Sequence, residues 1–380
     1  MLYFDCRFRS DYMTFQTPFT FRNGLVARDR LVMAPMTTYS GNPDFTVSEA
    51  ELAYYQLRSR SIGTVITAAT SVSDAAQAFP LQMSLKADYY IASQRQLAQT
   101  IQAEGALAIT QLHHGGRMND PSLHADHRNI VSASAVPADR PNSVTPRALT
   151  THEVIATIDD FAQAVRRAIT AGFDGAELHG ANTYLLQQFF SPHSNRRTDA
   201  YGGSLTKRMT FAGALIDACQ HVIATHATRP FLLGYRFSPE ELEEPGITLE
   251  DTEAFVRFLM TKKLDFLHVS LRHYRQSSSK NPADKTKIVD RLKPIITDAV
   301  PFFGVGGIET LDDVEAALED GYDFVATGMT LLADPDWGVR LRAKQLPRKV
   351  LDVATMPKPL YERLKRNATY FEQNGYTFSD

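Results

Sequence analysis

Short runs of β-branched and aromatic residues alternate along this chain with longer segments of helical periodicity. Such alternation is typical of parallel strands joined by crossover helices, and eight strand–helix units close into a barrel. We count eight units, so the sequence predicts an α/β fold of the (β/α)8 TIM-barrel type. The expected strands are 31–34, 64–68, 106–112, 175–179, 231–237, 266–270, 302–305 and 324–327, and the expected helices are 48–60, 89–104, 155–171, 205–224, 249–262, 283–299, 311–320 and 337–344.

The sequence indicates a single domain, because no linker rich in Pro, Gly or Ser divides the chain. We expect the barrel over residues 1–345, with 1–14 as a poorly structured N-terminal extension. Residues 346–380 are expected to be a C-terminal extension packed on the barrel or on a partner subunit, and association into a homo-oligomer stays open. The irregular stretch 113–150 exceeds the usual loop length, which predicts a functional loop with a small hairpin.

Charge and cysteine content narrow the class of protein. The 40 Lys and Arg residues nearly balance the 43 Asp and Glu residues, for a net charge of −3, and no run of like charges favours nucleic acid or an anionic membrane. Cys6 and Cys219 are too few for a disulfide framework or an iron–sulfur cluster, which fits a reducing cytoplasm. No signal peptide and no stretch of eighteen apolar residues is present, so we expect a cytoplasmic enzyme that acts on small molecules.

Three polar residues follow the fourth expected strand within residues 175–209. The spacing of His179 and Asn182, taken as a helical turn, places them side by side, so that their N–H groups can converge on one oxygen. Tyr184 can then supply a proton nearby. For His179 alone a satisfied core histidine is the plainer interpretation, whereas the three residues together favour a catalytic site.

Two segments near the start of the chain end strands in polar residues. Residues 31–41 leave the first strand through a proline, and a buried strand with a proline break and a polar turn is the plainer interpretation of this segment. Gln111 ends the third strand, at a position that looks buried. His113 and His114 after it are expected to be loop histidines rather than metal ligands, because no carboxylate or cysteine stands at ligand spacing.

Later strands end in an arginine and in glycines. Arg236 interrupts an apolar strand, and a buried arginine most often meets an anion or a carboxylate, so a structural salt bridge is the alternative to a ligand site. Residues 302–310 and 324–337 end the seventh and eighth strands with glycines. Backbone N–H groups there can bind phosphate in a barrel, although any short connection can use a glycine turn.

Taken together and in this order, these motifs closely resemble those of the old yellow enzyme family, over residues 15–340. Members of that family are FMN-dependent oxidoreductases that reduce activated C=C bonds. The resemblance implies FMN as the cofactor, NADH or NADPH as the hydride donor, and no metal ion. The residues that it assigns to FMN are Pro35, Met36, Thr37, Ala68, Gln111, Arg236, Gly306, Gly307, Gly328 and Met329.

The resemblance also implies a role for several of these residues. The backbone of 35–36 lies against the flavin ring, and the hydroxyl of Thr37 hydrogen-bonds flavin O4, which raises the reduction potential. Gln111 binds the pyrimidine edge, and Arg236 faces N1 and O2. The glycines form the phosphate cradle, where Met329 replaces the arginine that is usual in the family.

The implied reaction is a ping-pong reduction of α,β-unsaturated carbonyl or nitro compounds, that is, an ene-reductase activity. His179 and Asn182 would bind the substrate oxygen, Tyr184 would protonate the α-carbon, and Tyr39 would line the same pocket. Two other functions are weighed against it. One is a flavin-binding barrel without turnover that serves as a sensing module. The other is an aldolase or isomerase barrel, which would need a lysine or a carboxylate pair at the strand ends.

Overall fold

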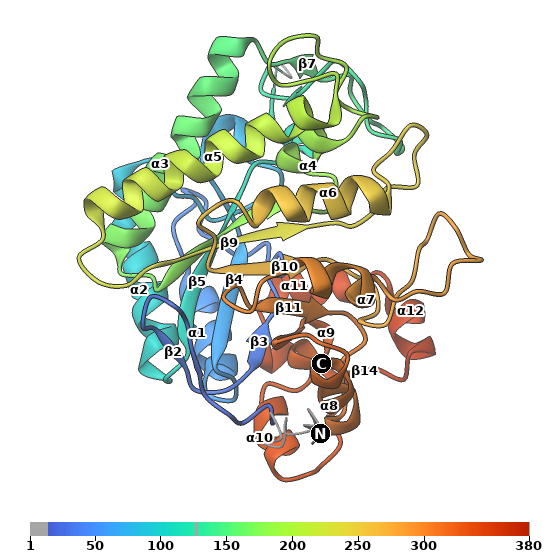
Figure 1. Cartoon of the computed structure of the whole chain (residues 1–380). Helices are drawn as coiled ribbons and strands as arrows, with labels where there is room; N and C mark the ends of the chain where they lie inside the picture. Colours follow the sequence, from blue (N-terminus) through green and yellow to red (C-terminus); the bar gives the residue numbers. More distant parts are fainter. Residues whose placement is uncertain (1–13, 126–127, 380) are drawn as a thin grey trace, which may run out of the picture.

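The computed structural model of the chain describes residues 14–125 and 128–379, and its centre is a closed barrel of eight parallel strands (Figure 1). The strands follow one another around the barrel in sequence order, and the last one, β12, pairs with the first, β3. The predicted TIM barrel is therefore confirmed. Its strands are β3 (Leu31–Met33), β4 (Thr64–Ser71), β5 (Leu107–His113), β8 (Gly175–Gly180), β9 (Leu232–Phe237), β10 (Phe266–Val269), β11 (Phe302–Val305) and β12 (Phe324–Thr327).

Helices cover the outside of the barrel, and Figure 1 shows α3, α5 and α6 together on the side of β9. Seven of the eight expected helices agree with the observed ones to within a few residues. The expected helix 283–299 is wrong in extent, because Pro294 lacks an N–H donor and the helix gives way to a 3₁₀ turn at Lys293–Ile295. The helices are α1 (Glu49–Ser59), α2 (Ile91–Ala103), α3 (Thr151–Ala171), α4 (Leu185–Phe190), α5 (Leu205–His226), α6 (Leu249–Leu259), α7 (Ile288–Leu292), α8 (Leu311–Glu319), α9 (Met329–Ala333) and α10 (Trp337–Arg342).

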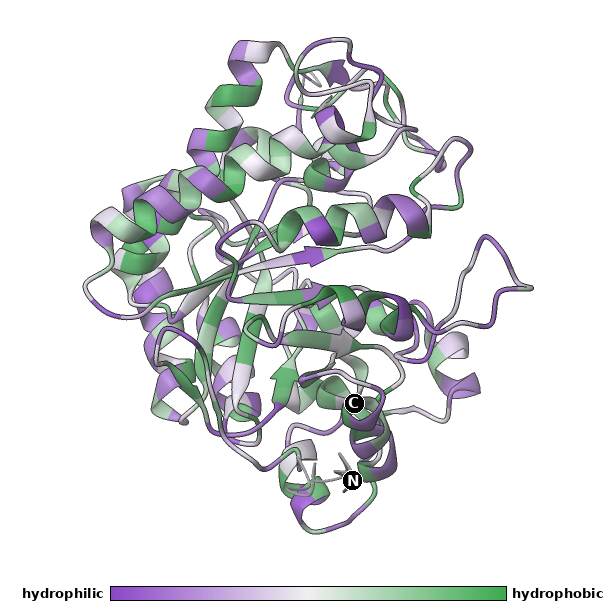
Figure 2. Cartoon of the chain, viewed as in Figure 1, coloured by the Kyte–Doolittle hydropathy of each residue, from purple (hydrophilic) through white to green (hydrophobic). Residues whose placement is uncertain are grey.

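Aromatic side chains fill the end of the barrel where the strands begin. The ring of Phe303 stacks on that of Phe266, with centroids 4.7 Å apart, and lies tilted by 35° against that of Phe324, with centroids 4.6 Å apart. The hairpin of β1 (Phe19–Thr20) and β2 (Val26–Ala27) closes this end, and Phe21 between its strands stacks on Phe324. Figure 2 shows hydrophobic residues concentrated on the barrel strands and hydrophilic ones frequent on the outer helices and loops. Because side chains fill the end of the barrel where the strands begin, a ligand can enter at the other end, where the carboxyl ends of the strands lie.

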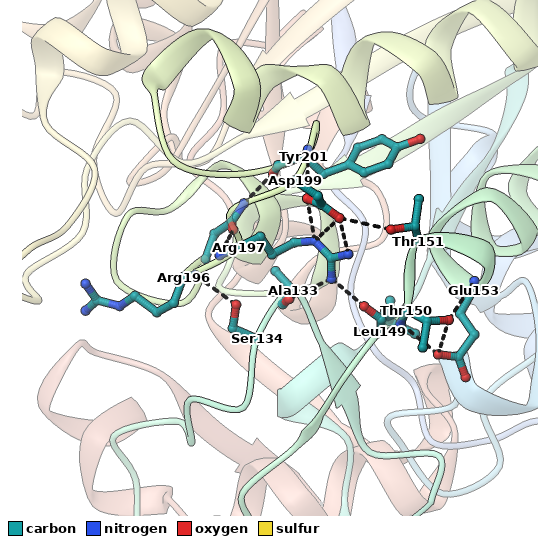
Figure 3. Close-up of polar contacts among 11 residues, drawn as sticks. Ala133, Ser134, Leu149, Thr150, Thr151, Glu153, Arg196, Arg197, Asp199 and Tyr201 are labelled. Atoms are coloured by element: carbon teal, nitrogen blue, oxygen red, sulfur yellow. Dashed lines mark hydrogen bonds and ion pairs between the residues drawn. The ribbon is translucent and has the colours of Figure 1, made fainter.

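The long loop 113–150 contains β6 (Val131–Ser132) and β7 (Arg147–Ala148), which pair in parallel. The expected small hairpin is therefore wrong, because the chain returns to β6 only after a wide excursion and a hairpin needs antiparallel strands. Arg197, in the polar turn after α4, holds this loop in position through hydrogen bonds (Figure 3). Its guanidinium donates to the carbonyl oxygens of Ala133 and Leu149 and is paired with Asp199.

The C-terminal segment contains β13 (Val350–Asp352), α11 (Lys358–Lys365), α12 (Ala368–Gln373) and β14 (Thr377–Ser379). It contacts the barrel of its own chain: Glu309, after β11, is paired with Lys349 and accepts a hydrogen bond from the hydroxyl of Tyr376 at 3.0 Å. The expected N-terminal extension, including Cys6, lies outside the described residues apart from residue 14. None of the helices in the described part of the chain is long and apolar enough to cross a membrane.

Candidate active site

A cavity of about 380 Å³ opens at the carboxyl ends of β3, β4, β5, β8 and β9. It brings together residues that are far apart in the sequence and that we predicted as site residues from four separate motifs. Ala69 and Phe79, which were not predicted, complete its wall. The predicted residues that line it are Pro35, Thr37, Gln111, His179, Asn182, Tyr184 and Arg236.

His179 lies near the end of β8, beside Arg236 of β9, and is 4% exposed. Its Nδ1 accepts a hydrogen bond from the backbone N–H of Ala181 at 3.3 Å. Burial, and then the neighbouring His113 and Arg236, hold the pKa of His179 well below its ordinary value. The ring is therefore neutral at physiological pH, and with Nδ1 as an acceptor its proton is on Nε2, which makes Nε2 a hydrogen-bond donor.

Asn182 lies in a turn and not on a helical turn as its spacing from His179 suggested. Its φ of 56° and that of Thr183, 66°, are both left-handed, a conformation that asparagine adopts more readily than most residues. Ser270 donates its hydroxyl to Asn182 Oδ1 at 2.9 Å, and the Asn182 backbone N–H donates to Ser238 Oγ at 2.9 Å. Because Oδ1 is occupied, the Nδ2 hydrogens are the part of the amide left to bind a ligand.

Tyr184 precedes α4, and its ring packs edge-on against His113 and His179, with centroids 4.3 and 5.0 Å away. Within residues 14–125 and 128–379, no protein group is hydrogen-bonded to its hydroxyl. Burial raises the pKa of Tyr184 to about 12, helped by Tyr39 and opposed by Arg140 and Arg236. The phenol therefore keeps its proton over the whole physiological range and has it available for a ligand in the cavity.

A buried carboxylate that the sequence analysis missed holds Gln111 in place. Glu177 Oε1 accepts from Gln111 Nε2 at 2.7 Å, and its Oε2 lies 2.7 Å from His268 Nδ1. Glu177 is fully buried. Because one N–H of the Gln111 amide is used, its oxygen and its second N–H are left to bind a ligand. Strand alternation could have found this residue, since Glu177 and His179 are two apart on β8 and so share a face.

Arg236 is 7% exposed and has no carboxylate in an ion pair among the described residues, so the structural salt bridge weighed above is absent from this part of the chain. Its Nη2 donates to Ser270 Oγ at 3.2 Å, whereas its buried Nε has no partner in the same residues. Burial lowers the pKa of Arg236, and Glu177 and Tyr184 raise it. An unpartnered buried guanidinium nitrogen at the cavity wall indicates a place for an anionic or electron-rich ligand atom.

The prediction of loop histidines is wrong for His113, which is the last residue of β5, whereas His114 does lie in the loop after the strand. β5 extends to His113, which is fully buried with its Nδ1 3.2 Å from Gln82 Nε2. His114 is also buried, and its Nδ1 accepts from the N–H of Gly116 at 3.1 Å. Burial lowers the pKa of each to about 3. No group of three or more potential metal ligands gathers in the described ranges.

An irregularity in the pairing of β4 with β5 falls between Ile66 and Ala69 and decides which alanine faces the cavity. Ala69 lines the cavity, whereas Ala68 packs into the core outside the barrel and donates its N–H to the Tyr55 hydroxyl at 2.7 Å.

Met36 packs against the end of β12, where a Cβ on Gly328 would lie 2.7 Å from the Met36 sulfur. Glycine at 328 thus allows this close approach.

The predicted phosphate residues lie at the ends of β11 and β12. Gly306 and Gly307 have φ values of 106° and 64°, a left-handed region that favours glycine, and residues 272–273 pack directly against them. Met329 begins α9 and is partly buried against the core. Tyr39 lies just outside the cavity, with its ring centroid 5.9 Å from that of Phe79.

A buried carboxyl group, that of Glu51, lies beside the loop after β3 and is expected to make the stability of the protein depend on pH. Glu51 accepts a hydrogen bond from Thr38, and burial raises its pKa from 4.5 to about 7. A raised carboxyl pKa means that the folded state binds the proton more tightly than the unfolded state. The stabilisation is therefore complete below pH 4.5 and is lost as the pH rises to about 7.

Glu51→Gln keeps the acceptor for Thr38 but cannot ionise. We expect the variant to be more stable than the wild type by about 3 kcal/mol at pH 8, and equally stable at pH 4.5. Urea unfolding at both pH values, with FMN in constant excess, measures this difference. The same difference at both pH values would show that Glu51 does not titrate in this range.

Comparisons with known proteins agree with this geometry. The model of the NADH:flavin oxidoreductase / NADH oxidase family matches residues 15–348. A protein of Bacillus subtilis (strain 168), named as a probable NADH-dependent flavin oxidoreductase, is 42% identical over 355 residues, which cover 91% of this chain and 94% of that protein. The NADH:fumarate oxidoreductase of Klebsiella pneumoniae (strain 342) is 41% identical over 90% of this chain, but the matched part is only 38% of that longer protein.

Among solved structures, morphinone reductase superposes with a TM-score of 0.75 at 26% identity, covering 89% of this chain and 91% of that one. The family match thus extends over most of the chain, and it includes the strand ends that form the cavity. The chain belongs to the NADH:flavin oxidoreductase / NADH oxidase family, the old yellow enzyme family, and is an NAD(P)H-dependent flavin oxidoreductase with FMN as its cofactor.

Proposed function

We propose that this enzyme reduces the activated C=C bond of α,β-unsaturated carbonyl or nitro compounds by a ping-pong mechanism, with NADH or NADPH as the first substrate. The observation that carries the proposal is the orientation of two donors. The acceptor ends of His179 and Asn182 are both occupied by protein groups, so both present N–H groups to the cavity. Two such donors can bind one substrate oxygen and stabilise the negative charge that develops on it.

The residues of the cavity fit a flavin. Arg236 has a buried nitrogen without a partner in the described residues, which suits the electron-rich N1 and O2 edge. The free oxygen of Gln111 suits a ring N–H, and the hydroxyl of Thr37 suits a ring carbonyl. When bound, FMN supplies the redox chemistry, since it takes a hydride equivalent from the nicotinamide and delivers it to the substrate. A phosphate grip by Gly306, Gly307, Gly328 and Met329 stays a proposal that rests on the resemblance.

The side chains of the protein then divide the remaining work. His179 and Asn182 orient the substrate by its oxygen and polarise the C=C bond. Tyr184, whose hydroxyl is free within the described residues and whose pKa is about 12, delivers a proton to the α-carbon. Because the chain belongs to a flavin oxidoreductase family, the aldolase or isomerase function is no longer needed to explain the barrel. A flavin-binding module without turnover is the competing function, and three intact polar residues at the cavity speak against it.

Phenols test the oxygen-binding pair, because a phenolate resembles the enolate that the pair would stabilise. Asn182→Asp retains a residue that tolerates the left-handed turn but loses the Nδ2 donor. We expect it to weaken phenol binding about tenfold or more, since a charge-assisted hydrogen bond is lost and an anion is added nearby. Titration of the holoenzyme, followed through the flavin absorbance, measures the affinity. An affinity equal to that of the wild type would refute the assignment of Asn182.

A further inference from the structure

A second hollow, of about 630 Å³, lies next to the catalytic cavity. Phe79 lines both, so the hollow continues the cavity outward. Its walls come from the loops after β3, β4 and β5 and from α11 of the C-terminal segment. We call it the vestibule, and the residues used below are Tyr39, Phe79, Met118, Asp120, Arg140 and Arg363.

Two exposed arginines from distant parts of the chain face the vestibule. Arg140 donates through Nη2 to the carbonyl oxygens of Met118 and Asn119, both at 3.1 Å, which fixes its position and leaves other donors free. The guanidinium of Arg363 lies over the ring of Tyr39, 4.2 Å from its centroid. Neither arginine is in an ion pair with any residue in the described ranges.

One carboxylate, Asp120, shares the vestibule with them. It is engaged elsewhere, because its Oδ1 accepts hydrogen bonds from the N–H and the hydroxyl of Ser122 at 2.9 and 2.7 Å. Burial raises the pKa of Asp120, but the hydrogen bonds from Ser122 and the charges of Arg140 and Arg363 together lower it, so both arginines lie within electrostatic reach of this carboxylate. The vestibule therefore carries a net positive charge of about one.

A short series of rings connects the vestibule with the catalytic residues. The ring of Tyr39 meets that of Phe79 at 5.9 Å, and Phe79 meets Tyr184 at 6.0 Å. Arg140 is also close enough to lower the pKa of Tyr184. A molecule whose reactive end lies at Tyr184 can thus extend along Phe79 and place its other end at the arginines.

We propose that Arg140 and Arg363 bind an anionic group, a carboxylate or a phosphate, on the far end of a molecule that reacts in the cavity. Planar guanidinium groups bind both oxyanions through paired N–H donors. The inference rests on the proposed function and narrows it to ligands with a remote negative charge. The anion has two possible sources, the unsaturated acceptor or the pyrophosphate of the nicotinamide donor, and the experiment separates them.

The first arm compares two acceptors of nearly equal size, 4-carboxycinnamaldehyde and its methyl ester. The ratio of kcat/KM for the acid to that for the ester is measured for the wild type and for Arg140→Gln/Arg363→Gln. If the acceptor carries the anion, the ratio falls about tenfold or more in the double variant, the effect of losing charge-assisted contacts. Arg366→Gln, an exposed arginine beside α11 that does not line the vestibule, is the control and keeps the wild-type ratio.

The second arm measures flavin reduction in the holoenzyme by NADH and by 1-benzyl-1,4-dihydronicotinamide, which has no phosphate. If the pyrophosphate is the anion, the Kd for NADH rises about tenfold in the double variant relative to that for the benzyl compound. A change in either arm supports the proposal and identifies the source, and ratios within twofold of the wild type in both arms overturn it. A wild-type enzyme that does not reduce even the ester contradicts the proposed function instead, and the second arm then decides the role of the arginines alone.

Discussion

Replacement of Tyr184 with phenylalanine is expected to slow C=C reduction by about a hundredfold or more, because it removes the proton donor and retains the ring. The edge-on contacts with His113 and His179 involve the ring, so the variant should keep the shape of the cavity. Reduction of the flavin by NADH needs no proton from this tyrosine and should change less than threefold. Stopped-flow measurement of each half-reaction separates the two effects.

The pH dependence gives a second view of the same step. Since the pKa of His179 is well below its ordinary value and that of Tyr184 is about 12, C=C reduction by the saturated wild type should vary little between pH 6 and pH 9.

Tyr201→Phe, at a tyrosine that does not line the cavity, is the matched control for Tyr184→Phe and should leave both half-reactions unchanged. Equal losses in both half-reactions of Tyr184→Phe would instead indicate a structural tyrosine.

The largest effect on stability is expected at Arg58, which is fully buried in α1. Its guanidinium donates to the carbonyl oxygens of Leu331 and Leu332 in α9, at 2.9 and 3.2 Å, and of Thr355 in the C-terminal segment, at 2.8 Å. It also lies 4.0 Å from the ring centroid of Tyr54. One side chain therefore joins α1, α9 and the segment that carries the vestibule helix α11.

Arg58→Met fills a similar space but leaves these buried carbonyl groups without donors. We expect a loss of about 4 kcal/mol in the free energy of unfolding, since unsatisfied buried acceptors cost far more than an exposed contact. Arg60→Met, two residues on, removes a half-exposed ion pair with Asp336 and should cost less than about 1 kcal/mol. Urea unfolding of both variants, with FMN in excess, measures the two losses in free energy of unfolding. Equal losses would show that Arg58 does not stabilise the contact between α1, α9 and the C-terminal segment.

Much of the fold could be predicted because hydrophobic periodicity reports directly on buried strands and amphipathic helices. The helices and the strand pairing that were not predicted correctly can each be explained by a particular feature of the chain. α4 and α9 are six and five residues long, too short to show a helical period. The helix at 283–299 was overextended across Pro294. The β6–β7 pairing depends on where the loop returns, which no local pattern gives.

The candidate site followed from residue types at strand ends, but its chemistry depends on contacts between distant residues. The amide of Asn182 is oriented by Ser270, which is 88 residues away, and that of Gln111 by Glu177, 66 residues away. The choice between Ala68 and Ala69 depends on an irregularity in strand pairing that the sequence does not reveal. Residue identity therefore indicates which groups can act, whereas the tertiary contacts determine which atom of each group is free.

The central claim is that one cavity lets bound FMN take electrons from a nicotinamide and pass them to an activated C=C bond. Anaerobic titration of the purified holoenzyme, followed by its absorbance spectrum, tests this directly. We expect a yellow protein with about one FMN per chain, bleached by NADH and restored to yellow by 2-cyclohexenone in equimolar amount, with cyclohexanone as the product. A bleached protein that stays colourless with the enone and recovers its colour only in air would contradict the claim.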